Sequence, residues 1–542
     1  MQLIDQKTKK IMEGCKERAW AAGLSFDDES LEYVVSNRDM LELMPKNMIP
    51  TLYDYWVHDV EVLKEKGKYE LYPSNPYETV INTRPAISFY NDNNPDWLNV
   101  MIFYHVIGHI DFFQNNLYFR HTWEYDLTGQ ALADKRLIAR LRSEYGRWVD
   151  YVIEFARGID NLVGYHAELA KYNQTKNACS KRMDYYFDYF LQTLKQINTS
   201  DYVKQVEEFN EYVIKHGTRL GEKAFFTDVQ KKYPEFEASF EKYKEHYEPK
   251  SPDLLQFLID HSPFLNKDEN KWMRSVLQII RTTSIYFQPQ IRTKIMNEGW
   301  ASYWHETLFL QDERIKGNEV SFARVNSAVT SMPRVGLNPY ALGMRMFYNL
   351  EEMADRGCYS YDFRRLQNAE QRKDFDRHTG TGRDFIFKVR ENFCDFTFIN
   401  DFVDQDFVDK NKLFVVGQRL NKERMTWEYY VRSRKSEDYR QMLFASLYHP
   451  PVIEIDPEKS ADGSLYLNHR HEGKPLVNEY IANTMLGIEY LWGSPVQLET
   501  NEADVKAGSE TDAEQGPQVS WRRVRYMMKD RQFSREELEA DD

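Results

Sequence analysis

The chain has 542 residues, of which 42% are hydrophobic and 15% aromatic, and its formal net charge is −14. This length allows a well-buried core and two to four domains, and the aromatic content excludes a disordered chain. The acidic balance argues against nucleic acid or an anionic membrane as a partner, because no strong basic patch offsets it.

The four cysteines are widely spaced at Cys15, Cys179, Cys358 and Cys394. This spacing predicts free thiols in a reducing compartment, and neither a disulfide framework nor a zinc knuckle. The first residues lack the apolar core of a signal peptide, and no run of about 18 apolar residues occurs. We therefore expect a cytoplasmic protein without a membrane span.

The first informative element is the apolar run FYHVIGHIDFF at residues 103–113, which contains His105 and His109. Residues four apart lie on one face of a helix, as the two histidines of helical zinc sites do. The alternative is a pair of core histidines satisfied by hydrogen bonds. Two histidines in one apolar helix double the number of ring nitrogens that need partners, and a metal ion satisfies that need efficiently.

This run differs from a zinc protease at Val106, where such enzymes carry the glutamate that activates water. A hydrolase would need another base, and the available candidates are His305, Glu306, Asp111 and Glu154. Glu154 lies on the predicted helix WVDYVIEFA, where a solvated surface position is the alternative interpretation.

Helical spacing continues through residues 131–162, and residues 176–217 predict an inserted helical hairpin. The next informative block is NEGWASYWHETLF, residues 297–309, in which Glu298 is a candidate third metal ligand. If Glu298 joins His105 and His109, tetrahedral coordination places the ligand atoms about 3–4 Å apart. His305 follows two turns after Glu298, roughly 10 Å along the axis. We interpret His305 as a proton-handling group beside the ion, with a packed core histidine as the alternative.

After about residue 410 the pattern changes to alternating or β-branched runs at 413–417, 426–433, 452–456, 464–471 and 496–500. Helical segments at 438–447 and 478–492 lie between them. We therefore predict an α+β fold: a predominantly helical body over residues 1–405 and a small α+β domain over residues 410–500. Residues 501–542 are polar and acidic, and predict a disordered tail.

Several of these blocks resemble the SpoVR family (stage V sporulation protein R). They are YETVINTRPAISFY, HVIGHIDFFQNNLYF, YFQPQIRTKIMNEGWASYWHETLF, GLNPYALG and PLVNEYIANTMLGIEYLWGSPVQLE. The resemblance implies a bacterial cytoplasmic protein linked to spore cortex formation, or to stress and stationary-phase physiology. It also implies two partners, a PrkA-type serine protein kinase and a von Willebrand-type protein. The Gly-His and EGWA-x-Y blocks are similar to those of gluzincin-like helical metallopeptidases, which is a partial analogy.

The chain departs from the family pattern at Thr282 and Thr283, where acidic residues are expected, and at Asn326, where a histidine is expected. If the expected residues serve the chemistry, this member is altered or inactive. His471 matches the C-terminal histidine of the pattern, with an exposed strand-end residue as the favoured interpretation.

Two functional hypotheses follow. The first is a hydrolase of amide bonds that uses Zn²⁺ or another divalent metal on a peptide or cell-wall-related substrate. The second is a non-catalytic scaffold that works with the kinase and holds a structural or vestigial metal. The missing glutamate at position 106 favours the scaffold, and the paired histidines favour the hydrolase. The sequence leaves the substrate, the metal and the oligomeric state open.

Overall fold

The computed structural model describes residues 2–43, 64, 77–165, 169, 180–195, 197, 199–246, 253–421, 426–456, 458–460, 463–472, 474–506 and 518–538. The chain divides into two compact units. The main unit comprises Met1–Tyr165 and Leu254–Asp542, and the helical unit comprises His166–Asp253. This division differs from the predicted boundary at residues 405–410, because residues on both sides of that point belong to the main unit.

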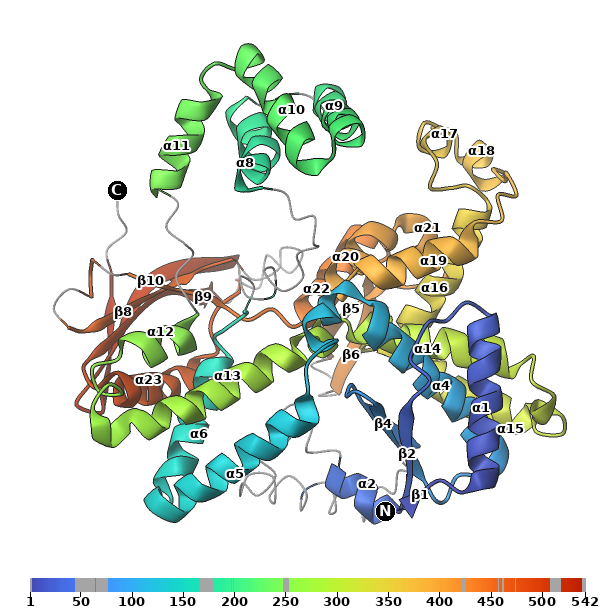
Figure 1. The fold of residues 1–542 in the computed structure, drawn as a ribbon, viewed down its shortest axis with the longest axis horizontal. Helices are drawn as coiled ribbons and strands as arrows, with labels where there is room; N and C mark the ends of the chain where they lie inside the picture. Colours follow the sequence, from blue (N-terminus) through green and yellow to red (C-terminus); the bar gives the residue numbers. More distant parts are fainter. Residues whose placement is uncertain are drawn as a thin grey trace. The chain divides into compact units, whose positions relative to one another are not determined.

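The helices of the main unit account for most of its described residues (Figure 1). They are α1 (Gln6–Ala21), α2 (Asn37–Leu43), α4 (Asp96–Asn115), η3 (Leu117–Thr122), α5 (Leu127–Tyr145), α6 (Trp148–Asp160), α12 (Leu254–His261), η5 (Asp268–Asn270), α13 (Lys271–Arg292), α14 (Lys294–Phe309), η6 (Glu313–Ile315), α15 (Glu319–Thr330), α16 (Pro339–Asp355), α17 (Tyr361–Arg364), α18 (Ala369–Lys373), α19 (Gly382–Asn392), α20 (Asp395–Phe402), α21 (Gln405–Lys410), α22 (Ser436–Ser446) and α23 (Asn478–Trp492).

An N-terminal sheet lies beside these helices, with strand order β1-β2-β4-β3. Its strands are β1 (Gln2–Leu3), β2 (Ser30–Val35), β3 (Glu78–Ile81) and β4 (Ala86–Asn91). β2 and β4 are parallel, and the two outer pairs are antiparallel. Figure 1 shows this sheet close to α1 and α4. β3 and α4 are in contact, so the sheet contributes one wall to the region around α4.

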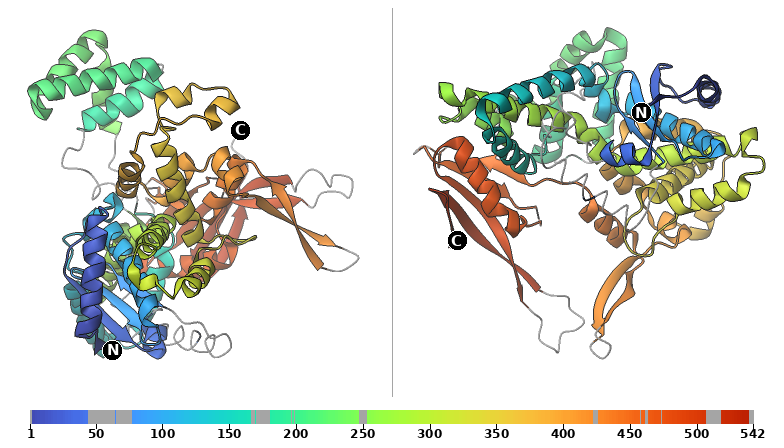
Figure 2. Two further views of the ribbon diagram at one scale, coloured as in Figure 1. Left: turned by 90° about the vertical axis from the view of Figure 1, so that its right-hand side faces the viewer. Right: turned by 90° about the horizontal axis from the view of Figure 1, so that it is seen from below.

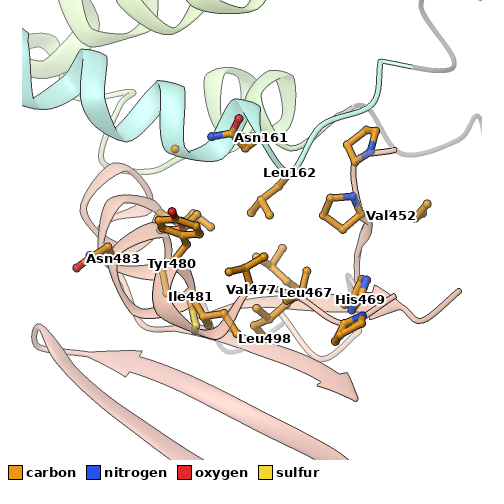
Figure 3. Close-up of a pocket in the computed structure, with 18 of the residues that line it drawn as sticks. Asn161, Leu162, Val452, Leu467, His469, Val477, Tyr480, Ile481, Asn483 and Leu498 are labelled. Carbon is orange, nitrogen blue, oxygen red and sulfur yellow. The ribbon is translucent and has the colours of Figure 1, made fainter. Parts of the chain in front are cut away.

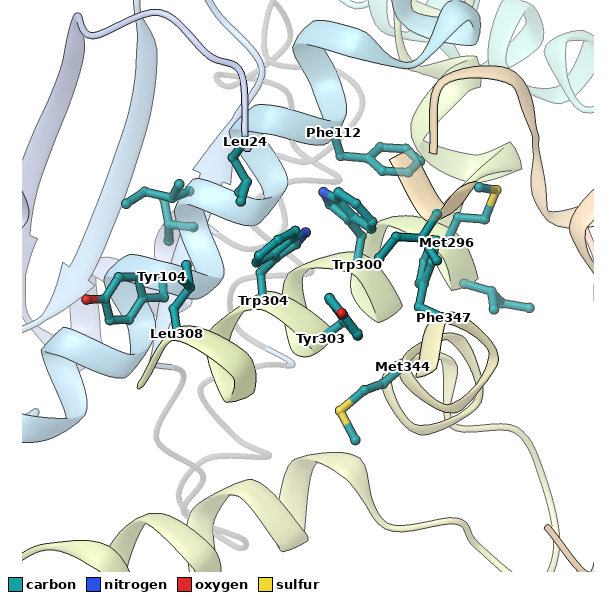
Figure 4. Close-up of a cluster of buried hydrophobic side chains, with 14 of the residues drawn as sticks. Leu24, Tyr104, Phe112, Met296, Trp300, Tyr303, Trp304, Leu308, Met344 and Phe347 are labelled. Carbon is teal, nitrogen blue, oxygen red and sulfur yellow. The ribbon is translucent and has the colours of Figure 1, made fainter. Parts of the chain in front are cut away.

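The core of the main unit forms where α14 packs between α4 and α16. Figure 4 shows Trp300, Trp304 and Phe347 among its buried side chains. Aromatic residues of this size exclude water from both sides of α14, which gives the helix a fixed orientation.

Glycines allow this packing to be unusually close. A Cβ atom at Gly108 of α4 would lie 2.8 Å from the Cα of Ala301, and one at Gly299 would lie 2.4 Å from the Cα of Gly343. Both distances are shorter than a van der Waals contact, so only glycine fits at these crossings. Gly108 lies between the two histidines in sequence and Gly299 follows Glu298, so the same close approach brings the sequence motifs together.

The predicted element order after residue 410 is observed. The strands are β5 (Val415–Asn421), β6 (Thr426–Ser433), β7 (Val452–Ile455), β8 (Leu465–Arg470), β9 (Val496–Lys506), β10 (Gln518–Lys529) and β11 (Gln532–Glu537). β5 and β6 form a separate two-stranded ribbon, and the others form a five-stranded sheet of order β11-β10-β9-β8-β7. Figure 2 shows the ribbon extending away from the helices of the main unit.

The expectation of a disordered tail over residues 501–542 is wrong for its described part. β9 continues to Lys506, and β10 and β11 add a hairpin to the sheet. Val524, Tyr526 and Met528 are buried at alternating positions, so one face of β10 is apolar although its overall composition is polar. Residues 507–517 and 539–542 lie outside the described part of the chain.

Two further predictions are modified by the structure. The helical pattern over residues 131–162 belongs to two helices, α5 and α6, separated at Gly146, whose φ of +59° ends the first helix. The predicted hairpin lies in the helical unit, which contains α8 (Lys181–Asp184), the π-helix η4 (Tyr185–Leu194), α9 (Thr199–His216), α10 (Thr218–Lys232) and α11 (Phe236–His246). Residues 176–179 of that hairpin lie outside the described part.

The helical unit has its own aromatic core, which includes Tyr186, Phe190 and Phe236. As for membranes, none of the helices that the structure describes is both long and apolar enough to span a bilayer.

Candidate metal centre

His105, His109 and Glu298 converge where α4 crosses α14. The Nε2 atom of His109 lies 3.5 Å from Oε2 of Glu298, and that of His105 lies 4.0 Å from the same oxygen. The two Nε2 atoms are 3.1 Å apart. Each of the three residues offers one ligand atom, and these atoms all lie within 4.8 Å of one another, close enough to bind one metal ion. These separations match the 3–4 Å that the sequence predicts for coordinating atoms.

A chain of hydrogen bonds fixes the tautomer of each neutral histidine ring. Nδ1 of His109 lies 2.9 Å from Oδ1 of Asn297, an acceptor, so this nitrogen carries a proton. Nε2 of His305 lies 2.8 Å from Oδ1 of Asn326, and is protonated for the same reason. Nδ1 of His305 is then an acceptor, so the proton between it and Nδ1 of His105, 2.9 Å away, belongs to His105.

When both rings are neutral, His105 and His109 each present a bare Nε2 lone pair to the other. Neither nitrogen can donate to its neighbour, and Oε2 of Glu298 is itself buried without a hydrogen-bond partner. Unsatisfied buried polar atoms each cost about 1–3 kcal/mol, and here three acceptors face one point. A cation at that point would satisfy all three, which is the arrangement that an imidazole–carboxylate metal site requires.

The surroundings disfavour a proton on His105 and on His305. Burial lowers the pKa of His105 well below its usual value, and the neighbouring His109 and His305 lower it further. Burial likewise lowers the pKa of His305. Both rings are almost inaccessible to solvent, with exposed fractions of 5% and 1%. His105 is thus suited to bind a metal as a neutral ligand.

A cavity of about 570 Å³ opens beside two of the three ligands. His105, Glu298 and His305 line it, together with Glu78 from β3 and Tyr340 from α16. Burial, reinforced by the charge of Glu298, raises the pKa of Glu78 to about 7. Tyr340 stacks on the ring of His105, and burial, reinforced by the charge of Glu298, raises the pKa of its hydroxyl.

Local structure explains how Tyr340 reaches the site. Asn338 caps α16 by accepting a hydrogen bond from the backbone N–H of Tyr340, and Pro339 occupies the first turn. The start of α14 is held by Asp395, whose two oxygens accept from the backbone N–H groups of Ile295 and Met296, each at 2.9 Å. Glu298 lies one turn beyond this cap.

The predicted proton-handling residues lie in different places. His305 lines the cavity, but both its nitrogens are engaged, by His105 and Asn326. Glu154 is not brought to the site: it lies on α6, 3.5 Å from Arg157, and lines a different cavity. This correction follows from α6 packing against α13 and α23, whereas α4 packs against α14.

The other two candidate bases, Asp111 and Glu306, form hydrogen bonds and an ion pair with neighbouring side chains. Asp111 accepts from the indole N–H of Trp300 at 2.8 Å and lies 3.3 Å from the buried guanidinium of Arg390. Glu306 accepts hydrogen bonds from Asn326 and from Tyr348.

The positions where the chain departs from the family pattern divide into two groups. Asn326 bridges His305 and Glu306, so the substitution directly affects the hydrogen bonds of the site. Thr282 and Thr283 lie on α13 and are not among the residues that line the cavity. His471 follows β8 and packs on Trp521, with ring centroids 4.1 Å apart. It is partly buried, which differs from the exposed strand-end position favoured from sequence.

Sequence reasoning missed Glu78, Tyr340 and Asn297. Signals for all three were present, because Glu78 belongs to YETV, Tyr340 to NPYALG and Asn297 to MNEGWA, three of the blocks that carry the resemblance. Nothing in their spacing predicted that Glu78 and Tyr340 line one cavity with His105, or that Asn297 contacts His109.

The fold and the site together define a predominantly helical α+β protein with a candidate histidine–carboxylate metal centre. Residues 3–449 match the family described as SpoVR like protein, and residues 451–503 match the SpoVR-like C-terminal domain. The chain belongs to the SpoVR family. It is similar to the uncharacterized protein YcgB of Escherichia coli (strain K12), at 24% identity over 497 residues, which cover 87% of each chain. No solved structure matches, so the gluzincin likeness remains a prediction from the motifs.

Proposed function

We propose that this chain is a metal-dependent hydrolase of amide bonds, in which His105, His109 and Glu298 hold a divalent cation. One observation carries the proposal: two bare imidazole nitrogens and a partnerless carboxylate oxygen, all buried, face the same point. Three nitrogen and oxygen ligands beside an open cavity are typical of catalytic zinc sites, which keep one position for substrate or water. A cation there would polarise a carbonyl and acidify water.

Glu78 is the residue best suited to exchange protons in this cavity. Val106 has no proton to exchange, and the two nitrogens of His305 are already hydrogen-bonded. Glu78 faces the cavity from β3, and a carboxyl whose pKa is about 7 can both accept and release a proton near neutral pH. Glu78 therefore takes the part of the glutamate missing from position 106.

His305 then acts by positioning His105. It accepts the Nδ1–H of that ring, which keeps the Nε2 lone pair directed at Glu298. Direct proton transfer by His305 is the alternative from sequence. The two roles differ in the expected effect of His305→Ala: loss of positioning weakens metal binding by about 10–100-fold, whereas loss of a proton-transfer group abolishes turnover and leaves metal binding unchanged.

The test is a turnover assay on a panel of peptides and muropeptides with the metal-loaded and the chelator-treated protein. Metal-dependent amide cleavage is expected, and Glu78→Gln should lower kcat by about 10²–10⁴-fold at unchanged metal content. Glu154→Gln is the matched control, because Glu154 lies at a different cavity. Wild-type protein with full metal and no cleavage across the panel would overturn the proposal.

A second candidate function is the non-catalytic scaffold, and the β5–β6 ribbon favours it. Trp427, Tyr429 and Val431 occupy alternate positions of β6, and therefore one face, with exposed fractions of 64%, 56% and 44%. Such a face fits an interaction with another protein. The partners to test by pull-down are those of the family resemblance, a PrkA-type serine kinase and a von Willebrand-type protein, with Trp427→Ala as the disrupting variant. A role in spore cortex formation or stress physiology rests on the same resemblance.

A further inference from the structure

A second, larger cavity is lined by residues other than those of the candidate metal centre. It has a volume of about 850 Å³ and lies between α6 and the C-terminal elements β7, β8 and α23. None of the three metal ligands lines it. Cavities of roughly 300–1,000 Å³ are the size that binds small molecules in proteins. The cavity is therefore large enough for a ligand of its own.

The interior of this cavity is apolar. Figure 3 shows Leu162 from the segment after α6, Leu467 and Leu498 from the sheet, and Ile481 and Val477 from the start of α23 and the residue before it, around the cavity. Water in such a space finds few hydrogen-bond partners, so an apolar ligand gains free energy by displacing it. Val477 is 58% exposed, which places it where the cavity meets solvent.

Glu154 lines the cavity from α6 and lies 3.5 Å from Arg157, and the other charged residues of the lining lie near the end of β8, where most of them are also paired. Arg470 lies 3.1 Å from Glu472, and His449 lies 2.9 Å from the other oxygen of that carboxylate. Lys474 also lines the cavity, and the described part of the chain contains no ion-pair partner for it. An apolar cavity with an uncompensated cation near its charged end favours a ligand with an apolar chain and an anionic head.

We propose that this cavity binds a single-chain amphiphile, a long-chain carboxylate, with its chain among the leucines and its head near Lys474. The proposal is independent of the metal centre, because no residue is shared between the two sites. It assigns to the C-terminal part of the chain a ligand-sensing or ligand-carrying role.

Substitution of Gly158 by a larger residue can reduce the space inside the cavity. Gly158 lies on α6 and lines the cavity, and a Cβ atom there would have only Thr484 Oγ1 nearby, at 4.0 Å. A larger side chain at this position extends into open space and removes a helix-interior glycine, so it should not destabilise the fold. Gly158→Leu therefore places a four-carbon side chain inside the cavity, and Gly158→Ala, which adds one methyl group, is the matched control.

The experiment measures binding of oleate to the full-length protein by titration calorimetry, below the concentration at which oleate forms micelles. Wild type and Gly158→Ala should bind one equivalent with affinities within twofold of each other, and Gly158→Leu should bind at least tenfold more weakly. Lys474→Gln should weaken oleate about threefold, as the loss of one solvent-exposed ion pair does, and leave oleyl alcohol unaffected. Val477→Asp adds a carboxylate at the exposed edge and should weaken oleate without affecting the core.

A second experiment measures whether the protein co-sediments with phosphatidylglycerol vesicles. It distinguishes a free amphiphile from a membrane lipid as the source of the acyl chain. Binding of free oleate without co-sedimentation supports a soluble amphiphile, and co-sedimentation that Gly158→Leu abolishes supports a membrane lipid as the source. Equal oleate binding by Gly158→Leu and wild type, with both folded by circular dichroism, overturns the proposal. So does an absence of oleate binding to wild type, or preference for an apolar peptide over oleate.

Discussion

At the scale of single residues, the candidate site depends on neighbours that fix each imidazole ring. Asn297 accepts the Nδ1–H of His109, and His305 accepts that of His105. Without these acceptors either ring could rotate or change its tautomer, and the Nε2 lone pairs would no longer meet at Glu298. Removal of a group that orients a metal-binding histidine in this way typically lowers the metal affinity about 10–100-fold.

Asn297→Ala should therefore weaken zinc binding by about 10–100-fold, because His109 loses the partner that holds its tautomer. The measurement is competition with a chromophoric zinc chelator. Asn270→Ala is the control: Asn270 is similarly buried, at 8% exposed against 9% for Asn297, and bonds the carbonyl of Phe264. Equal zinc affinities for the two variants would show that Asn297 does not orient a ligand.

The residues of the site differ in how well the sequence predicts them. His105 and His109 are four apart on one helix, so their shared face follows from helical geometry alone. Glu298 was identified by its unusual setting among aromatics, and the structure brings it to the histidines. Glu78 comes from an edge strand of the N-terminal sheet, and its place depends on how β3 packs on α4. No local pattern carries that information.

At the scale of elements, the crossing of α14 with α16 decides whether Glu298 faces the histidines. Gly299 and Gly343 face each other there, and backbone atoms occupy the space that a side chain would need. Backbone of a packed helix cannot move aside as the end of a flexible side chain can, so any added atom separates the helices.

Gly299→Ala should destabilise the protein by about 1–3 kcal/mol, the range for overpacked cores, and weaken its metal binding. Gly14→Ala is the control, because Gly14 lies in α1 with nothing within 4 Å of its added Cβ. That control should be neutral or stabilising by up to about 1 kcal/mol, through helix propensity. Urea unfolding measures both, and similar stabilities for the two variants would contradict the close-packing account.

Elements after residue 410 show where sequence patterns succeed and fail. The helix predicted at 478–492 is observed with those bounds as α23, because its apolar spacing is regular. The last two strands were missed because their composition is polar. β10 and β11 are held by backbone pairing and by cross-strand ion pairs such as Arg525–Glu536, which composition alone does not distinguish from a solvated tail.

At the scale of the whole molecule, the sequence predicted a helical α+β protein, and the structure agrees. It did not predict that residues 166–253 form the separate unit, since their helical pattern continues that of the preceding segment. Which helices share a core depends on long-range contacts. Periodicity reports which face of a helix is apolar, and not which other helix that face meets.

Stability should depend on pH through buried carboxyls. Burial raises the pKa of Asp395 to about 7 and that of Asp111 to about 6. Each group keeps its proton in the folded state at pH values where the unfolded chain has lost it, so stability falls as pH rises from about 4 to about 7. Asp395→Asn should reduce the fall in the free energy of unfolding between about pH 4 and pH 7 by on the order of 2–4 kcal/mol. The reason is that one pKa unit corresponds to about 1.4 kcal/mol.

Urea unfolding of chelator-treated protein between pH 4.5 and 7.5 measures the effect. Asp228→Asn is the control, because Asp228 is exposed and its pKa is lowered by hydrogen bonds with Lys231 and Tyr212. An identical pH slope for wild type and Asp395→Asn would contradict the account of Asp395.

The central claim is that His105, His109 and Glu298 bind a divalent metal, and elemental analysis tests it most directly. Protein purified without chelator should contain close to one equivalent of a divalent transition metal. His109→Ala should contain almost none, while His121→Ala, which changes a histidine bonded to the Ile285 carbonyl, should retain the full equivalent. Wild-type protein that holds no metal after incubation with excess zinc and desalting, or metal that persists in His109→Ala, would contradict the claim.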